Sequence, residues 1–137
     1  IILQKQSGGK DIVVVDAAMN DLIRPTLYQA YHGLLPVARK LLKNNNNNNI
    51  DKITTDVVGG ICESGDYLAL QRPLPKLQNG DILAICQAGA YATVMASNYN
   101  HRMLPAEVMV DGKHHRIIKL RQDFDDFLKT EKLKNKK

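Results

Sequence analysis

The sequence predicts a β-dominated domain, a barrel or sandwich with short helices, from three observations. β-branched runs bounded by turn residues recur along the chain, as at 11–16 and 53–58. Turn signals containing Asn-Gly or Asp-Gly stand between apolar runs at 79–81 and 111–112. The 137 residues, 44% of them hydrophobic, are enough for one domain with a core of its own. Short strands separated by tight turns are typical of all-β folds.

The first part of the chain predicts strands around a short helical turn. Residues 11–16 are a β-branched run bounded by acids, which predicts a buried strand. After it, we expect Asn20 or Asp21 to cap a helical turn that Pro25 then limits. The run 34–39 predicts a further strand, which its proline places at an edge or a bend.

Six asparagines at 44–49 are the next distinct feature. A homopolymer without periodicity has nothing to pack, so we expect an inserted solvent loop between strands. The strand expected at 53–58 then leads into a turn at 59–66 that contains three glycines.

The uncharged run 82–100 is too polar for a membrane span, which needs about 20 mainly apolar residues. We therefore expect buried strands there, with 82–86 as one strand and 92–96 as extended chain, and no membrane partner. Beyond this run, 106–110 and 115–120 predict a hairpin closed at Asp-Gly. Residues 123–128 predict a short amphipathic helix with its apolar residues, Phe124, Phe127 and Leu128, on one side.

Residues 1–128 are expected to form one domain, and residues 129–137 a lysine-rich disordered tail. The formal net charge is +5, of which the tail contributes +4 from five lysines and one glutamate, leaving +1 for the rest. Such a tail is more often a solvated end than a phosphate-binding surface, so the sequence argues against a nucleic-acid partner. Because no methionine and no basic-then-apolar leader opens the chain, we expect it to be part of something longer.

The cysteines and histidines predict no metal site and no disulfide framework. Cys62 and Cys86 lack the C-x-x-C spacing of zinc sites and of redox motifs. His114 and His115, as neighbours on a strand, face opposite ways and cannot both bind one ion without distortion. Two free thiols fit a reducing cytosol, so we expect a cytoplasmic protein, or a plastid protein in a photosynthetic eukaryote.

Cys62 and Glu63 are the strongest candidates for chemistry. They follow a charge-free run and stand in a glycine-containing turn, which can present both side chains on one side although neighbours on a strand alternate. An ordinary thiol has a pKa of about 8.5, is mostly protonated at neutral pH, and can donate a proton. The other interpretation of Cys62 is a cysteine that simply packs in the core. For Cys86 we favour that core interpretation.

Arg24 is a second candidate, because a fixed guanidinium donates two parallel hydrogen bonds to a carboxylate. Tyr28 lies four residues later, so on a helical turn both side chains project from the same side. A surface arginine is equally consistent with the composition.

Several ordered strings resemble the carboxy-terminal part of the meso-diaminopimelate decarboxylase family, fold-type III pyridoxal-phosphate enzymes. Each string is weak alone, but the ordered set covers most of residues 8–120 and is highly specific. The strings are residues 15–28, 30–32, 56–59, 61–66, 80–83, 89–91, 97–100 and 102–110. The resemblance implies the C-terminal β-domain of such an enzyme, without the barrel that carries the cofactor lysine and the phosphate cradle.

The resemblance also implies roles for five residues. Cys62 would protonate the α-carbon after carbon dioxide leaves, and Glu63 would bind the distal ammonium of meso-diaminopimelate. Arg24 would hold the distal carboxylate, with Tyr28 beside it, and Tyr91 would contact the cofactor, pyridoxal 5'-phosphate, or the substrate.

A head-to-tail homodimer with shared sites is implied as well, in which Cys62 and Glu63 serve the partner's cofactor and Tyr91 its own subunit's. Two alternatives stay open. Ornithine- or arginine-type decarboxylases are related, but the ornithine type has aspartate after the cysteine and no arginine clamp. A non-catalytic truncated or dimerisation domain is the other alternative.

Overall fold

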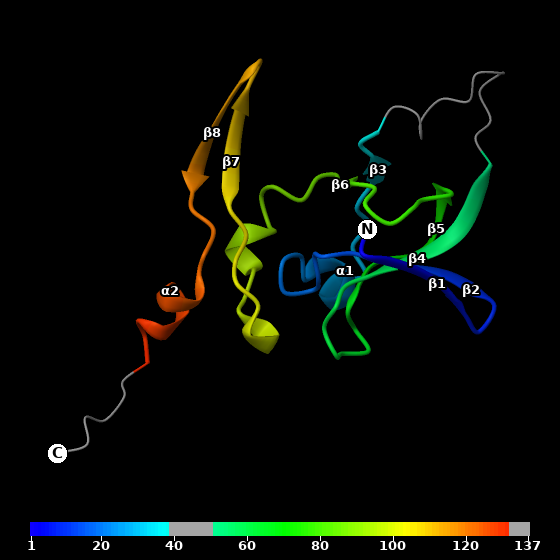
Figure 1. Ribbon diagram of the computed structural model, residues 1–137, viewed down its shortest axis with the longest axis horizontal. Helices are drawn as coiled ribbons and strands as arrows, with labels where there is room; N and C mark the ends of the chain where they lie inside the picture. Colours follow the sequence, from blue (N-terminus) through cyan, green and yellow to red (C-terminus); the bar gives the residue numbers. More distant parts are fainter. Residues whose placement is uncertain (39–50, 132–137) are drawn as a thin grey trace. The chain divides into compact units, whose positions relative to one another are not determined.

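The computed structural model describes residues 1–38 and 51–131. The asparagine run 44–49 and most of the tail, residues 132–137, lie outside the described residues, so the expectations for them stay predictions. Strands outnumber and outlast the short helices in the described chain, which confirms the β-dominated class (Figure 1). Its elements are β1 (Leu3–Ser7), β2 (Lys10–Val14), α1 (Arg24–Tyr28), β3 (Leu34–Pro36), β4 (Lys52–Val58), β5 (Tyr67–Pro75), β6 (Leu83–Ile85), the 3-10 turns η2 (Thr93–Met95) and η3 (Tyr99–His101), β7 (Glu107–Asp111), β8 (His114–Lys119) and α2 (Phe124–Leu128).

The chain gathers into two compact units, Ile1–Ala96 and Ser97–Lys137. The first unit contains a four-stranded sheet in the order β1-β2-β4-β5 and a two-stranded sheet of β3 and β6 (Figure 1). β2 and β4 run parallel, whereas β1 and β5 pair antiparallel with their neighbours at the two edges. β2 and β4 confirm the strands expected at 11–16 and 53–58.

Two strands of this sheet escaped prediction. β1 is polar and mostly exposed, and it pairs with β2 across a turn in which Gly8 and Gly9 have φ of 58° and 75°. β5 contains two prolines, which an edge strand tolerates because one side of it needs no ladder hydrogen bonds. The pairing of β4 with β5 is irregular near Asp56, whose Oδ1 accepts the Gln71 N–H at 2.7 Å.

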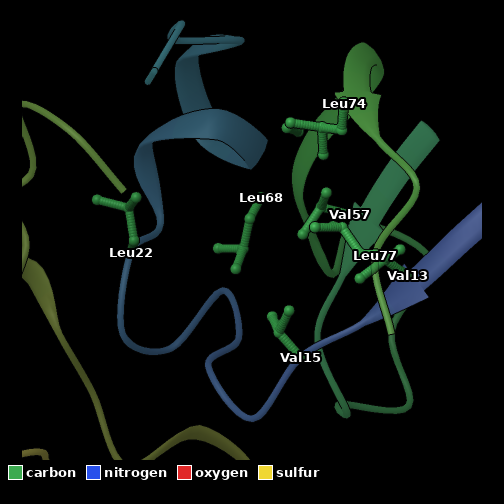
Figure 2. Packing of buried hydrophobic residues seen from close by; sticks show 8 residues of the cluster. Val13, Val15, Leu22, Val57, Leu68, Leu74 and Leu77 are labelled. Carbon is green, nitrogen blue, oxygen red and sulfur yellow. The ribbon is translucent and has the colours of Figure 1, made fainter. Parts of the chain in front are cut away.

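The hydrophobic core of the first unit is formed by eight buried residues from several segments. Figure 2 shows Leu68, 1% exposed, in the middle of this cluster. The members are Val13, Val15, Leu22, Val57, Leu68, Ala69, Leu74 and Leu77. The core therefore joins β2, β4 and β5 to the segment before α1, and it fixes the strands that lead into the turn at 59–66.

The interpretation of residues 82–100 as buried strands was wrong. Only β6 is a strand there, and none of these residues is buried. The stretch expected to be extended, 92–96, contains the 3-10 turn η2 instead. Runs of small residues such as Ala-Gly-Ala-Tyr-Ala are uncharged without being able to fill a core, so lack of charge misled the interpretation.

The prediction that Pro25 ends a helical turn was wrong as well. Pro25 occupies the first turn of α1, where its missing N–H costs nothing. Neither Asn20 nor Asp21 caps this helix, since Ile23 is the N-cap residue. The Asp21 carboxylate accepts the Ala18 N–H at 2.9 Å and so closes the preceding turn.

The second unit confirms the predicted hairpin and helix. β7 and β8 pair antiparallel, and Asp111 faces His114, so the two-residue turn consists of Gly112, with φ of 57°, and Lys113. α2 begins after Asp123, which forms a capping box with Asp126. No helix within the described residues is both long and apolar enough to cross a membrane.

Candidate functional site

The turn that follows β4 is held by its own backbone. The Gly59 N–H donates to the Asp66 carbonyl at 3.3 Å, which closes the turn at its base. Within it, the Glu63 N–H donates to the Ile61 carbonyl at 2.8 Å and the Asp66 N–H to the Glu63 carbonyl at 3.0 Å. Residues 59–66 are called the thiol turn below, because Cys62 lies at its exposed tip.

The thiol turn carries Cys62 and Glu63 at its surface. Both residues are exposed, so neither is a core side chain. The Glu63 Oε1 accepts the Gly65 N–H at 3.3 Å, and the carboxylate thus bends back over its own turn. A thiol and a carboxylate therefore stand on neighbouring exposed residues of the first unit.

Helix α1 is tied directly to the thiol turn. The Thr26 hydroxyl donates to the Gly65 carbonyl, and the Tyr67 hydroxyl donates to the Pro25 carbonyl at 3.1 Å. A Cβ on Gly65 would lie 2.8 Å from the Thr26 side chain, so only glycine permits this approach. The segment that bears Arg24 and the turn that bears Cys62 thus form one connected structure.

Arg24 lies beside two tyrosine rings. Its guanidinium carbon lies 5.0 Å from the centre of the Tyr91 ring and 5.9 Å from the centre of the Tyr28 ring, within the range of cation–π attraction. Both tyrosines are exposed, and Arg24 is half-buried. No salt bridge involves Arg24 within the described residues, so its planar fork is available for an anion from outside.

The structure brings the predicted residues together in two groups. One cluster contains Arg24, Tyr28 and Tyr91, although the two tyrosines are 63 positions apart in the sequence. Cys62 and Glu63 share the thiol turn, and the hydrogen bonds of α1 connect the two groups.

Three residues of the site were given no role from the sequence: Asp66, Thr26 and Tyr67. All three make hydrogen bonds that hold the site in place. One signal pointed to Asp66, an acid placed between a glycine and the start of a strand, a position where short acidic side chains often bind backbone N–H groups.

The remaining thiol and histidines lie elsewhere. Cys86 is half-buried, and its Cβ packs 3.3 Å from the position that a Cβ on Gly33 would take. His114 and His115 are both exposed on β8. Among the described residues, no group of three histidine, cysteine or acidic side chains is placed to hold a metal ion.

Comparison with known proteins decides the family. Residues 1–89 match the model of the family described as "Pyridoxal-dependent decarboxylase, C-terminal sheet domain". The chain belongs to this family. As a C-terminal sheet domain of a pyridoxal-dependent decarboxylase, it resembles the diaminopimelate decarboxylase of Aquifex aeolicus, at 45% identity over 121 residues, and that of Campylobacter jejuni, at 44% over 132 residues.

Solved structures agree with this. The sheet domain superimposes on the crystal structure of diaminopimelate decarboxylase from Helicobacter pylori complexed with L-lysine, with a TM-score of 0.80 and 35% identity over 94% of this chain and 29% of that one. The match to the Aquifex relative covers 88% of this chain and 27% of the relative. The match to the Campylobacter relative covers 96% of this chain and 30% of the relative. It therefore spans less than a third of the length of the relatives that it matches.

Proposed function

We propose that this sheet domain is the C-terminal part of a diaminopimelate decarboxylase, which converts meso-2,6-diaminopimelate to L-lysine and carbon dioxide. The observation that carries the proposal is that an accessible thiol, and an arginine with no salt bridge within the described residues, lie on two segments tied by hydrogen bonds. The names of the relatives support it.

The exposure of Cys62 supports the role proposed for it. When carbon dioxide leaves, the electron pair of the broken bond stays with the α-carbon, and a new C–H bond needs one proton. Cys62 donates that proton from its sulfur, and water later restores it. An exposed thiol on a fixed turn can reach a substrate, and a positioned side chain that gives up its proton to the reacting atom acts as a general acid.

The proposed substrate carries both an ammonium and a carboxylate at its distal end, so its pocket needs both signs of charge. Glu63 supplies the anion and Arg24 the cation, and two parallel hydrogen bonds from a guanidinium select a carboxylate. Tyr28 lies beside the guanidinium and donates a further hydrogen bond to the same carboxylate. A substrate without a distal carboxylate, as in the ornithine-type alternative, would leave Arg24 unused.

The family is named for its pyridoxal cofactor, which when bound supplies the electron sink for the reaction. Within the described residues, Tyr91 fits such a group: the residue is 57% exposed and the Arg24 guanidinium lies over its ring, so its hydroxyl can reach a phosphate or a ring substituent. Because this chain covers less than a third of its relatives, most contacts to the cofactor come from the remainder of the enzyme.

We also propose a head-to-tail homodimer in the cytoplasm, in which the thiol turn completes the partner's site. An exposed thiol and carboxylate, both outside the core of their own unit, fit residues that act on a neighbouring subunit.

The test joins residues 1–137 to the N-terminal remainder of the Aquifex aeolicus diaminopimelate decarboxylase, in place of its matching part. With pyridoxal phosphate, the joined protein is expected to form lysine from meso-diaminopimelate, followed by amino-acid analysis. A joined protein that folds and binds the cofactor but forms no lysine would contradict the proposal and favour the non-catalytic alternative. Release of putrescine from ornithine at a comparable rate would favour the ornithine-type alternative.

A further inference from the structure

Asp66 is a buried acid within the described residues whose side chain bridges two separate segments of the first unit. It is 5% exposed, and a carboxylate at that depth is costly unless hydrogen bonds satisfy its oxygens. No salt bridge involves it within the described residues. Backbone amides take the place of a cation: Oδ1 accepts the Met19 N–H at 2.7 Å, and Oδ2 accepts the Ile61 N–H at 2.6 Å.

The two amides belong to the two halves of the candidate site. Ile61 directly precedes Cys62 in the thiol turn. Met19 lies in the turn that leads to α1, where the Asp21 and Leu22 amides both donate to the Ala18 carbonyl. The Asp66 carboxylate therefore links the backbone next to Cys62 to the segment that leads to Arg24.

The space around the carboxylate is provided by a glycine. A Cβ on Gly59 would lie 2.5 Å from Asp66 Oδ2 and 2.5 Å from the Ala18 Cβ. The thiol turn and the segment at Ala18 can approach closely only because residue 59 lacks a side chain, and the carboxylate fills the contact.

We propose that Asp66 is the positioning residue of this site, which sets where the Cys62 sulfur lies relative to Arg24. The inference rests on the function proposed above for the thiol turn. Charge-assisted hydrogen bonds to a buried carboxylate are stronger than neutral ones, so two of them give the turn one defined position. Asp66 touches neither substrate nor cofactor, and its effect passes through Cys62.

Asp66→Asn is the direct test, because asparagine keeps the size and one acceptor but turns an N–H₂ group toward one of the two amides. The control is Asp56→Asn, since Asp56 is also buried and accepts a backbone N–H at 2.7 Å, but from Gln71 at the β4–β5 irregularity. Amide hydrogen exchange is followed by NMR in the 137-residue chain.

In Asp66→Asn, the amides of Glu63 and of residue 66, which close the thiol turn, are expected to exchange about tenfold faster or more, the effect of losing a hydrogen bond to a charged group. The Val15 amide, bonded to the Val58 carbonyl at 2.9 Å, keeps its exchange rate. In Asp56→Asn the turn amides keep theirs. Equal acceleration of all three amides would reduce Asp66 to a general stabiliser and overturn the proposal, as would no acceleration at the turn.

The pH profile of Cys62 alkylation by iodoacetamide gives a second readout, with Cys86 in the same chain as the internal reference for global opening. Asp66→Asn is expected to change the Cys62 profile and leave that of Cys86 unchanged. Thr26→Val, which breaks the link to Gly65 without changing charge, separates a shift in position from a change in local charge. An unchanged Cys62 profile in both variants would contradict the positioning role.

If Asp66→Asn fails to fold, a measurement on the unmodified chain still tests the proposal. NMR couplings across the hydrogen bonds, from the Met19 and Ile61 amides to the Asp66 carboxyl carbon, are expected to be measurable, and their absence would overturn the proposal. All these readouts are independent of decarboxylation. If they agree with expectation while the joined protein forms no lysine, the proposed function fails and the structural role of Asp66 stands.

Discussion

Arg24 is the residue whose surroundings select the proposed substrate. An arginine on a surface usually pairs with nearby acids, but here the guanidinium lies against the rings of Tyr28 and Tyr91 and has no salt bridge among the described residues. The aromatic contacts hold the planar group without using its hydrogen-bond donors. The donors are thereby left for a carboxylate.

Substituting Arg24 by lysine in the joined protein is expected to raise the KM for meso-diaminopimelate about tenfold, since a loss of about 1.5 kcal/mol accompanies one hydrogen bond to a charged group. Lysine keeps the charge but neither the planar fork nor the stacking. Steady-state kinetics measure the change.

Arg72→Lys is the control, because Arg72 also lies over a tyrosine, Tyr31, at 3.5 Å, but has no assigned role in the site. Its KM is expected to stay within about twofold of the parent value. Equal increases in KM for both variants would show that Arg24 has no special part in substrate binding.

At the scale of elements, the thiol turn depends on the close contact between Gly59 and the segment at Ala18. Gly59→Ala would place a methyl group 2.5 Å from the Ala18 Cβ and 2.6 Å from its Cα, and backbone cannot move aside cheaply. We expect a loss of about 3 kcal/mol in the free energy of unfolding, at the upper end for overpacking.

Gly89→Ala is the matched control, since a Cβ there has no atom within 4 Å. Its free energy of unfolding is expected to change by less than about 0.5 kcal/mol. Urea denaturation of the two variants makes the comparison, and a Gly59→Ala protein as stable as Gly89→Ala would show that the contact is not tight in solution.

The stability of helix α2 is expected to depend on pH. A hydrogen bond from Lys129, followed by the bond from the Asp123 backbone, lowers the pKa of Asp126 below its ordinary value. A carboxyl whose pKa is lowered on folding stabilises the folded state above the pKa of the unfolded chain, and this stabilisation is lost as the pH falls through the lowered folded pKa. α2 is therefore expected to lose stability as the pH falls through the lowered pKa of Asp126.

An NMR titration of the Asp126 carboxyl carbon together with the α2 amides measures this. Lys129→Ala removes the main cause and is expected to raise the pKa of Asp126 toward its ordinary value. An unchanged titration in Lys129→Ala would show that the ion pair does not persist in solution.

The strands that could be predicted from the sequence are those whose own residues carry a clear local pattern. The β-branched runs of β2 and β4 and the Asp-Gly hairpin of β7 and β8 carry local signals, and the structure confirms them. β1 and β5 lack such signals, because one is polar and the other contains two prolines, and both depend on pairing with a neighbour. Strand pairing across sequence is not visible in a local pattern.

The candidate site divides in the same way. Residue type and position made Cys62, Glu63 and Arg24 candidates, whereas their roles came from the resemblance to the decarboxylase family. The contact of Arg24 with Tyr91 and the links made by Asp66 depend on tertiary contacts over many positions, so no local rule could have found them.

At the scale of the whole molecule, the described core belongs to the first unit alone. All eight members of the core cluster lie before residue 96, whereas none of the described residues 97–131 is buried. An isolated two-stranded hairpin with one short helix is marginal in water. A protein of residues 1–96 is therefore expected to unfold cooperatively, and one of residues 97–137 to remain unfolded.

Urea unfolding followed by circular dichroism tests both fragments. Leu68→Ala in residues 1–96 should lower the free energy of unfolding by about 2–5 kcal/mol, the cost of a cavity in a packed core. A cooperative transition in residues 97–137 would contradict the assignment of the core.

The most direct test of the central claim compares two thiols in the joined protein. Cys62→Ala is expected to slow lysine formation roughly a hundredfold or more, the usual contribution of a general acid, while Cys86→Ala keeps nearly the parent rate. The rate per bound cofactor is measured at saturating meso-diaminopimelate. Equal rates for the two variants would show that the sulfur on the thiol turn donates no proton in the reaction.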